Sequence, residues 1–281
     1  MEMDLLGYET GAPPPQRVTA QGRAIAFRES GYDNQRVLVL VHGVGSLAAS
    51  WGPQFVSLPQ HGLRVIAWDA PGYGGSDKLP DAAPRPDDYA AALGDFVAAL
   101  GLKRFVLLGH SMGALIAASY CRRDAGAHVE KLILASPSSG YGTASEDVRR
   151  QRLESRLADM AALGPAGLAE KRAGTVLSPQ APQRALMLVR AVMREMRPDG
   201  YAQAVGMLGR ADTFADAPGI AMPTLVVSGT GDGVTPEAGC RRVAEAIAGA
   251  RYEPIPGAGH ACYIEAPGPF DAAVLRFIGA A

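Results

Sequence analysis

The sequence has few cysteines, almost no net charge and no long apolar run, and each shortage excludes a class of protein. The three cysteines, Cys121, Cys240 and Cys262, are an odd number without paired metal-type spacing, so neither a disulfide framework nor a metal site is expected. The formal net charge is -1 and the basic residues are scattered, which argues against a nucleic-acid partner. No apolar run is long enough to span a bilayer, so no membrane partner is expected.

The first residues, Met1 to Thr10, include acidic side chains where a secretory signal has basic ones, and no apolar segment follows them. We therefore expect a cytoplasmic protein. The chain has 281 residues, of which 48% are hydrophobic and 20% charged, a composition typical of a globular protein with a sizeable buried core. The sequence does not indicate an oligomeric state.

What the sequence does contain is an alternation of apolar runs and helical stretches. Two short β-like stretches, 17–20 and 24–28, predict an antiparallel hairpin around Gln21 and Gly22. The apolar runs that follow are typical of parallel strands buried on both faces of a sheet. They occupy residues 37–41, 65–68, 105–108, 132–134 and 225–227. The pattern predicts an α/β fold, with a mostly parallel central sheet flanked by helices.

The alternation stops between Tyr141 and about Asp212, where apolar residues recur at helical spacing. We interpret this segment as a helical cap, inserted after the sixth strand and lying over the C-terminal edge of the sheet. Strands at 224–228 and 252–255, with helices near 236–248 and 269–278, then complete the sheet. The predicted organisation is a first part of the core at 1–140, the cap at 141–212 and a second part of the core at 213–281.

One pentapeptide, Gly109-His110-Ser111-Met112-Gly113, joins an apolar run to a run of small residues. This is the pattern of a strand, a sharp turn and a helix, and glycines leave room in such a turn for a serine hydroxyl to project. Ser111 is therefore a candidate nucleophile. Because the chain has 34 glycines, chance alone would produce such a pattern in roughly one similar chain in five. Other residues must therefore decide whether Ser111 is a nucleophile.

A serine hydroxyl attacks a carbonyl only when an imidazole accepts its proton and a carboxylate orients that imidazole. Among five histidines, His260 is the best candidate base, because it stands in a glycine-rich loop after the strand at 252–255. Asp232 is the best candidate carboxylate, because it follows the strand at 224–228, and ligands collect at this edge of open α/β sheets.

The remaining histidines and aspartates have structural interpretations. His42 is expected to hold the loop that it begins, His110 to point away from Ser111, and His61 and His128 to be solvated or bonded structurally. Four other aspartates are weaker candidates for the carboxylate that orients His260: Asp69, Asp77, Asp212 and Asp216.

The negative charge that develops during attack needs two N–H donors. We expect the backbone N–H of Met112, at the start of a helix whose dipole assists it, and the backbone N–H of Val44, in the loop after the strand at 37–41. Because these donors supply the electrophilic help, no metal or organic cofactor is implied. The expected partner is a small-molecule substrate.

Jointly these motifs resemble the α/β-hydrolase superfamily in order and spacing over nearly the whole chain. They occupy residues 42–45, 68–77, 109–113, 231–232 and 259–260. The order Ser111, Asp232, His260 also matches that superfamily. The resemblance implies the α/β-hydrolase fold and serine-hydrolase chemistry.

Within the superfamily, the cap and tail look most like 3-oxoadipate enol-lactonases and related ring-fission hydrolases. The segments that carry this likeness are 164–170, 197–201, 222–227 and 232–236. Two features depart from it. The cap lacks the tryptophan expected before Leu177 in an enol-lactonase, and His110 stands where C–C hydrolases of meta-cleavage products have asparagine.

An anionic substrate such as a dicarboxylate lactone would need a basic partner in the cap. The candidates are Arg149, Arg150, Arg152, Arg156, Arg190, Arg194 and Arg197. Most of them are expected to lie on solvated helix faces.

We therefore expect a serine hydrolase that acts on a small carboxylic ester or lactone through Ser111, His260 and Asp232 and an acyl-enzyme. One alternative is hydrolysis of a C–C bond in a meta-cleavage ring-fission product by the same triad. Another is a ligand-binding sensor that keeps the fold without turnover. Dehalogenase and epoxide hydrolase chemistry are disfavoured, because those relatives use an aspartate where Ser111 stands.

Overall fold

The computed structural model describes residues 10–123 and 127–279. Segment 1–9, which carries the expectation that no secretory signal is present, lies outside the described residues. Eight strands form one sheet in the order β1-β2-β4-β3-β5-β6-β7-β8. Their bounds are β1 Gln16–Ala20, β2 Arg23–Ser30, β3 Arg36–Val41, β4 Leu63–Trp68, β5 Phe105–His110, β6 Val129–Ala135, β7 Thr224–Gly229 and β8 Arg251–Ile255.

The pairing of the strands confirms the predicted hairpin and the mostly parallel sheet. β1 and β2 pair in antiparallel register through a turn at Gln21 and Gly22, whose φ angles are 49° and 76°. β2 is also antiparallel to β4, whereas every later pair is parallel. The central strands are fully buried, as in Leu38 to Val41 of β3, because helices cover both faces.

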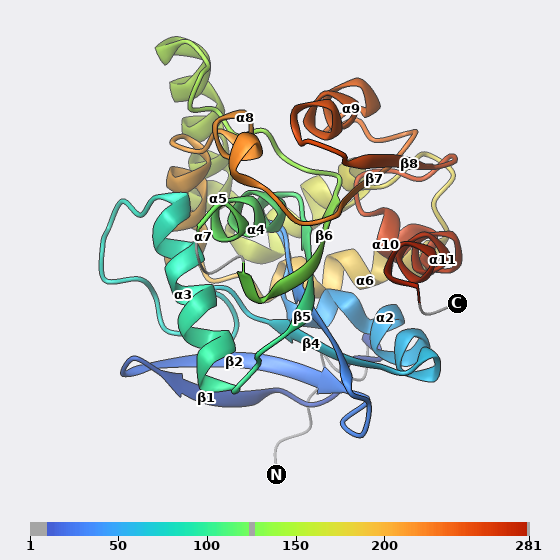
Figure 1. Cartoon of the computed structure of the whole chain (residues 1–281). Coiled ribbons are helices and arrows are strands. Elements are labelled where there is room, and N and C mark those ends of the chain that lie inside the picture. Colours follow the sequence, from blue (N-terminus) through green and yellow to red (C-terminus); the bar gives the residue numbers. More distant parts are fainter. Residues whose placement is uncertain (1–9, 124–126, 280–281) are drawn as a thin grey trace.

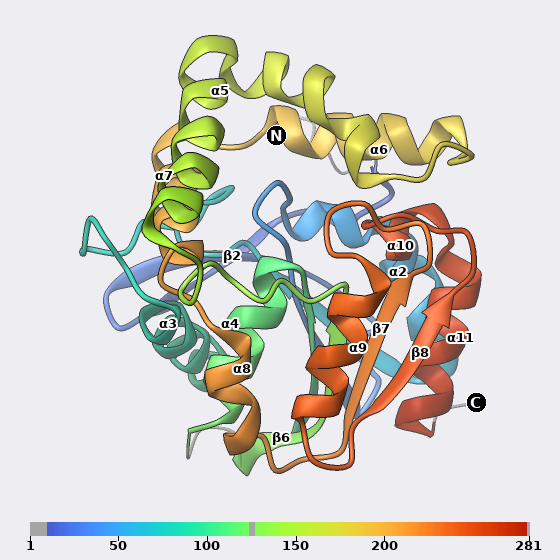
Figure 2. The same cartoon turned by 90° about the horizontal axis from the view of Figure 1, so that it is seen from above.

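The helices of the core form two layers around the sheet (Figure 1). α3, α4 and α9 cover one face and α2 and α11 the other (Figure 2). Their bounds are α2 Gly52–Ser57, α3 Pro86–Ala99, α4 Met112–Cys121, α9 Glu237–Ala246 and α11 Pro267–Ile278; the short α8 spans Thr213–Asp216 and α10 spans Cys262–Glu265. In the part of the chain that the structure describes, no helix is both long and apolar enough to cross a membrane.

Between β6 and β7 the chain forms a helical cap, as the sequence predicts. We use this name for α5 Glu146–Arg172, the 3-10 helix η4 Ala173–Val176, α6 Gln183–Arg194 and α7 Pro198–Leu208. These helices lie beyond the C-terminal ends of the strands (Figure 2). The division of the chain at residues 141 and 212 stays a prediction.

The cap packs unevenly. α5 bends at Gly164, which has φ 63° and is followed by Pro165, and the half before the bend extends away from the sheet (Figure 1). Along this half the residues Leu157 and Leu163 are 37% and 43% exposed. In contrast, Val192 of α6 is buried. The side of the cap nearest the sheet is therefore the well-packed side.

Candidate active site

The turn that carries Ser111 is strained and crowded. Ser111 lies between β5 and α4 with φ 55° and ψ -112°, a conformation that costs a residue other than glycine about 1–3 kcal/mol. A Cβ atom on Gly109 would lie 2.3 Å from the carbonyl oxygen of Gly113, and one on Gly113 would lie 2.1 Å from the carbonyl oxygen of Val41. Both glycines are therefore required by close backbone contacts, as the pentapeptide predicts.

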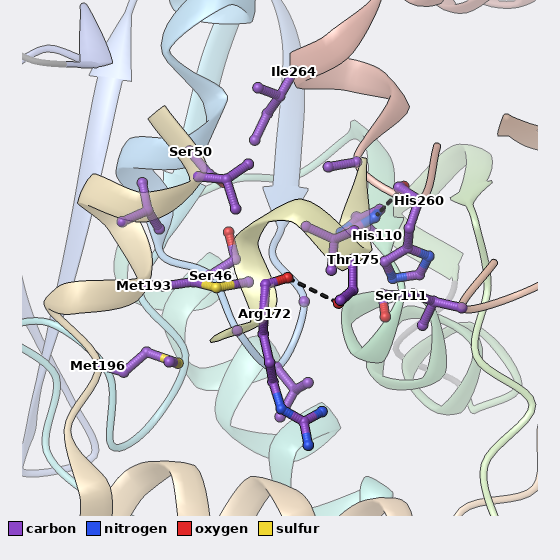
Figure 3. Close-up of a pocket in the computed structure, with 18 of the residues that line it drawn as sticks. Ser46, Ser50, His110, Ser111, Arg172, Thr175, Met193, Met196, His260 and Ile264 are labelled. Atoms are coloured by element: carbon purple, nitrogen blue, oxygen red, sulfur yellow. Dashed lines mark hydrogen bonds between the residues drawn. The ribbon is translucent and has the colours of Figure 1, made fainter. Parts of the chain in front are cut away.

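Asp232 and His260 meet beside Ser111. The Nδ1 atom of His260 lies 2.9 Å from Oδ2 of Asp232, and both residues are buried. Because an ionised carboxylate only accepts hydrogen bonds, Nδ1 carries the proton and Nε2 is free to accept one. His260 and Ser111 line the same cavity and lie next to each other in Figure 3. The structure thus brings together the three residues that the sequence selects.

Asp232 is held by a full set of hydrogen bonds. Its Oδ1 accepts the backbone N–H groups of Val234 and Thr235, each at 2.8 Å, and its Oδ2 accepts the Thr235 hydroxyl at 2.7 Å as well as His260. Burial by itself would raise the pKa of Asp232, but the interactions with His260 and Thr235 outweigh it and lower the pKa to about 2. The carboxylate is therefore ionised at neutral pH.

Thr235 was not among the predicted site residues. Its hydroxyl also lies 3.0 Å from Nδ1 of His260, so it contacts both members of the pair. A turn in which an aspartate accepts N–H groups two and three residues later is a local motif. The spacing of Asp232 and Thr235 directly after a strand is the signal by which the sequence could have revealed it.

The loop after β3 fixes the direction of the Val44 N–H group. The carbonyl of Gly43 accepts hydrogen bonds from Nδ1 of His42 at 2.8 Å and from the N–H of Ser46 at 3.1 Å. Because the peptide is planar and trans, holding this carbonyl also aims the Val44 N–H in the opposite direction. Val44 and Ser111 line the same cavity.

The second predicted donor is the N–H of Met112. Met112 is the first residue of α4, and the first amides of a helix have no acceptor within it. Among the described residues, neither this N–H nor that of Val44 has a hydrogen-bond acceptor. Both are therefore available to an oxygen atom bound beside Ser111.

Two other histidines support the loops around the site. His42 accepts the N–H of Ala70 on Nε2 at 2.9 Å, and burial lowers its pKa to about 4, so it is a neutral structural residue, as expected. Nε2 of His110 donates to the carbonyl of His260 at 3.0 Å, and burial lowers the pKa of His110 to about 3. The sequence predicts that His110 points away from Ser111, but His110 also lines the cavity beside Ser111.

The four competing aspartates bond elsewhere. Asp69 accepts the N–H of Ala48, Asp77 the N–H of Ala24 and Asp212 the N–H of Phe214, while Asp216 pairs with Arg122. Within residues 10–123 and 127–279, no group of three or more histidine, cysteine, aspartate or glutamate side chains is placed to hold a metal ion.

A mostly apolar cavity of about 110 Å³ lies above Ser111, under the cap. The apolar lining from the cap includes Leu168, Val176, Val189, Val192, Met193 and Met196. Among the seven predicted cap arginines, Arg156 lines this cavity. Arg172, which was not among them, lines it too. In Figure 3 the guanidinium of Arg172 extends away from Ser111, and it pairs with Asp159 at 2.7 Å.

The cap is tied to the His260 loop by one carboxylate. Oε2 of Glu265 accepts the N–H of Gly259 at 3.0 Å and the N–H of Ser178 at 2.9 Å, and its Oε1 accepts the Ser178 hydroxyl. Ser178 follows η4 of the cap, and Gly259 precedes His260. Glu265 therefore couples the position of the cap to that of the imidazole.

The fold agrees with comparison to known proteins. The model of the alpha/beta hydrolase fold family matches residues 36–267, so the chain belongs to this family. The chain is 28% identical to epoxide hydrolase A of Mycobacterium tuberculosis, over 95% of this chain and 98% of that protein.

Solved structures give the same result. The chain is similar to the enol-lactonase from Burkholderia xenovorans LB400, with a TM-score of 0.84 and 26% identity, covering 94% of this chain and 100% of that one. It is also similar to a thermophilic esterase from Thermogutta terrifontis, solved with malate bound, with a TM-score of 0.83 and 25% identity over 95% and 98% of the two chains. Family membership supports an enzyme of the hydrolase class.

Proposed function

We propose that the protein is a serine hydrolase that cleaves small carboxylic esters or lactones through an acyl-enzyme. The observation that carries the proposal is the fully bonded Asp232, which holds the His260 imidazole beside a serine on a strained turn. Nε2 of His260 accepts the Ser111 proton while Oγ bonds to the carbonyl carbon. The oxyanion accepts hydrogen bonds from the N–H groups of Val44 and Met112.

Collapse of this intermediate breaks the bond to the leaving oxygen, which takes the proton from His260. In the second half, water gives a proton to His260 and attacks the acyl carbon, and Ser111 leaves with that proton. An ester yields an acid and an alcohol. A lactone yields one ring-opened acid. Asp232 stays ionised throughout, because its pKa of about 2 lies far below neutral pH.

Likeness to solved hydrolases supports both substrate types. One similar structure is an enol-lactonase and another is an esterase. The likeness to an epoxide hydrolase supports the fold, but the residue at the turn is a serine hydroxyl. The mostly apolar cavity under the cap suits a small organic acyl or leaving group.

The test compares Ser111→Ala with the unchanged protein on p-nitrophenyl acetate and on an enol-lactone. We expect the substitution to lower kcat by at least roughly 10³-fold, because it removes the attacking oxygen. Ser155→Ala, which changes an exposed serine on α5, is the matched control and should leave kcat unchanged. Equal rates in Ser111→Ala and the unchanged protein would contradict the proposal.

The same assay separates the alternatives. Turnover of a ring-fission diketone without turnover of either ester or lactone would favour C–C bond hydrolysis. A single turnover followed by tight retention of the product would favour a sensor.

A further inference from the structure

Ser111 lies in the wall of two hollows. A second hollow, of about 180 Å³, is lined by the loop after β6 and by residues at and before the start of α9. Four residues line both hollows: Val44, Ser111, Arg156 and Val234. A molecule whose carbonyl group lies at Ser111 therefore has room on two sides.

The two hollows differ in chemistry. Side chains of Val189, Val192 and Met193 line the first, so an apolar group gains free energy by leaving water there. The second is lined by several polar residues, among them Ser138, Ser139, Tyr141 and Arg242. A charged group keeps hydrogen-bonding partners in such a setting. The pair of hollows suits a substrate with one apolar end and one charged end.

Arg156 lines both hollows and has no acidic partner among the described residues. Five other arginines of the cap pair with carboxylates: Arg150 with Asp147, Arg172 with Asp159, Arg190 and Arg194 with Glu170, and Arg197 with Asp199. In the part of the chain that the structure describes, Arg156 interacts instead with the phenol oxygens of Tyr141 and Tyr201. A half-buried cation without a counter-ion costs free energy. An anion that binds beside Arg156 therefore gains more free energy than one that binds beside an arginine already paired with an acid.

The two tyrosines that interact with Arg156 line different hollows. Tyr201 lines the first hollow and Tyr141 the second. The planar guanidinium of an arginine at this place can donate paired hydrogen bonds to a planar carboxylate. Arg242, an exposed residue that also lines the second hollow, adds positive charge.

We infer that the second hollow binds a carboxylate of the substrate through Arg156. The inference rests on the proposed ester or lactone hydrolysis and specifies its substrate class. The substrate carries a free carboxylate a short chain away from the carbonyl that Ser111 attacks. Its remaining part occupies the apolar hollow under α6.

The test compares two esters that differ only in charge. Mono-p-nitrophenyl glutarate carries a carboxylate where p-nitrophenyl valerate carries a methyl group. Arg156→Met keeps an apolar stem and removes the cation. It should lower kcat/KM for the glutarate ester roughly 10- to 100-fold, the range for a lost charge-assisted hydrogen bond, and change kcat/KM for the valerate ester less than about twofold. Arg156→Lys should recover part of the loss.

Arg150→Met is the matched control, because Arg150 is an exposed and paired arginine on the same helix, and it should change neither value. An equal loss for both esters in Arg156→Met would indicate a structural role and overturn the inference, as would no loss for either. A selective loss in Arg172→Met instead would place the carboxylate in the first hollow and also overturn it.

A binding measurement separates this inference from the proposed reaction. Calorimetric titration of Ser111→Ala with monomethyl glutarate needs no turnover. We expect binding that is lost in Ser111→Ala/Arg156→Met, with methyl valerate binding equally to both proteins. Such a result supports the carboxylate site even if neither ester is hydrolysed, which would contradict the proposed function alone. Equal binding of monomethyl glutarate to both proteins would overturn the carboxylate site alone.

Discussion

The strand-end loops of the core and the helices of the cap hold their polar groups in different ways. In the core, both oxygens of Asp232 are bonded, and the peptide before Val44 is held by two donors to one carbonyl. In the cap, five arginines pair with acids, and Arg156, which lines both hollows, lacks an acidic partner among the described residues. The hydrogen bonds of the core fix the geometry of the site, whereas the cap places the charge of Arg156 at the cavity, where a ligand can bind.

The two regions also differ in charge. Residues 141–212 hold eleven lysines and arginines against eight aspartates and glutamates, so the rest of the chain carries a net negative charge. A net positive charge on residues 141–212 favours the approach of anions to this part of the molecule. We therefore expect mutations in the core to change mainly the rate of the reaction, and mutations in the cap to change mainly the selection of substrates.

The largest expected effect is in the core. In Asp232→Asn the amide oxygen should take the Oδ1 position, which accepts two backbone N–H groups, so the NH₂ group faces Nδ1 of His260. This orientation forces the wrong imidazole tautomer, and kcat should fall roughly 10⁴-fold. Steady-state kinetics on p-nitrophenyl acetate checks it, with circular dichroism to show an intact fold. A change in KM with kcat unchanged would contradict the assignment of the chemical step to the core.

A smaller effect concerns pH and again distinguishes the core, because residues 141–212 contain no histidine. Burial lowers the pKa of His42 to about 4 and that of His110 to about 3, below the ordinary value of 6.5. Since the folded state favours the neutral forms, their contribution to stability is present above pH 6.5 and is lost as pH falls toward these values.

At pH 5 the free energy of unfolding should be lower than at pH 7.5 by roughly 2 kcal/mol for each of these two histidines. Urea unfolding at both pH values measures the difference. His128→Gln, at an exposed histidine, should show the same difference as the unchanged protein. Identical unfolding curves at the two pH values would show that these histidines do not control acid stability.

The smallest effect tests the connection between the two regions. Glu265→Ala leaves the buried N–H groups of Gly259 and Ser178 without their acceptor, which should destabilise this contact by about 1–3 kcal/mol and lower kcat several-fold by loosening the His260 loop. Glu265→Gln keeps an acceptor and should restore most of kcat. If both variants had the stability and the kcat of the unchanged protein, the position of the cap would not affect the imidazole of His260.

Local sequence patterns were sufficient for much of the site. The glycines around Ser111 are required by contacts within a few residues, so the turn is recognisable from the sequence. Asp232 and His260 could be selected because parallel strands bring their C-terminal ends to one edge. The hairpin and the helical cap were also predicted, because apolar periodicity reports local structure directly.

The side chains that meet across long distances in the sequence could not be selected in this way. Seven cap arginines were candidates, and the packing of α5 decided that Arg156 lines the cavity and that Arg172 joins it. Glu265 reaches Ser178 across 87 positions. Helical spacing indicated α5 but not the bend at Gly164 or the exposure of Leu157.

The sequence by itself determined the fold and the residues around the predicted nucleophile, since strand ends, tight turns and helix starts obey short-range steric rules. Tertiary structure alone decided the two hollows, the position of Arg156 in the wall of both, and the carboxylate that ties the cap to the imidazole loop. These features depend on how helices far apart in the sequence pack against each other, and no short-range rule encodes that packing.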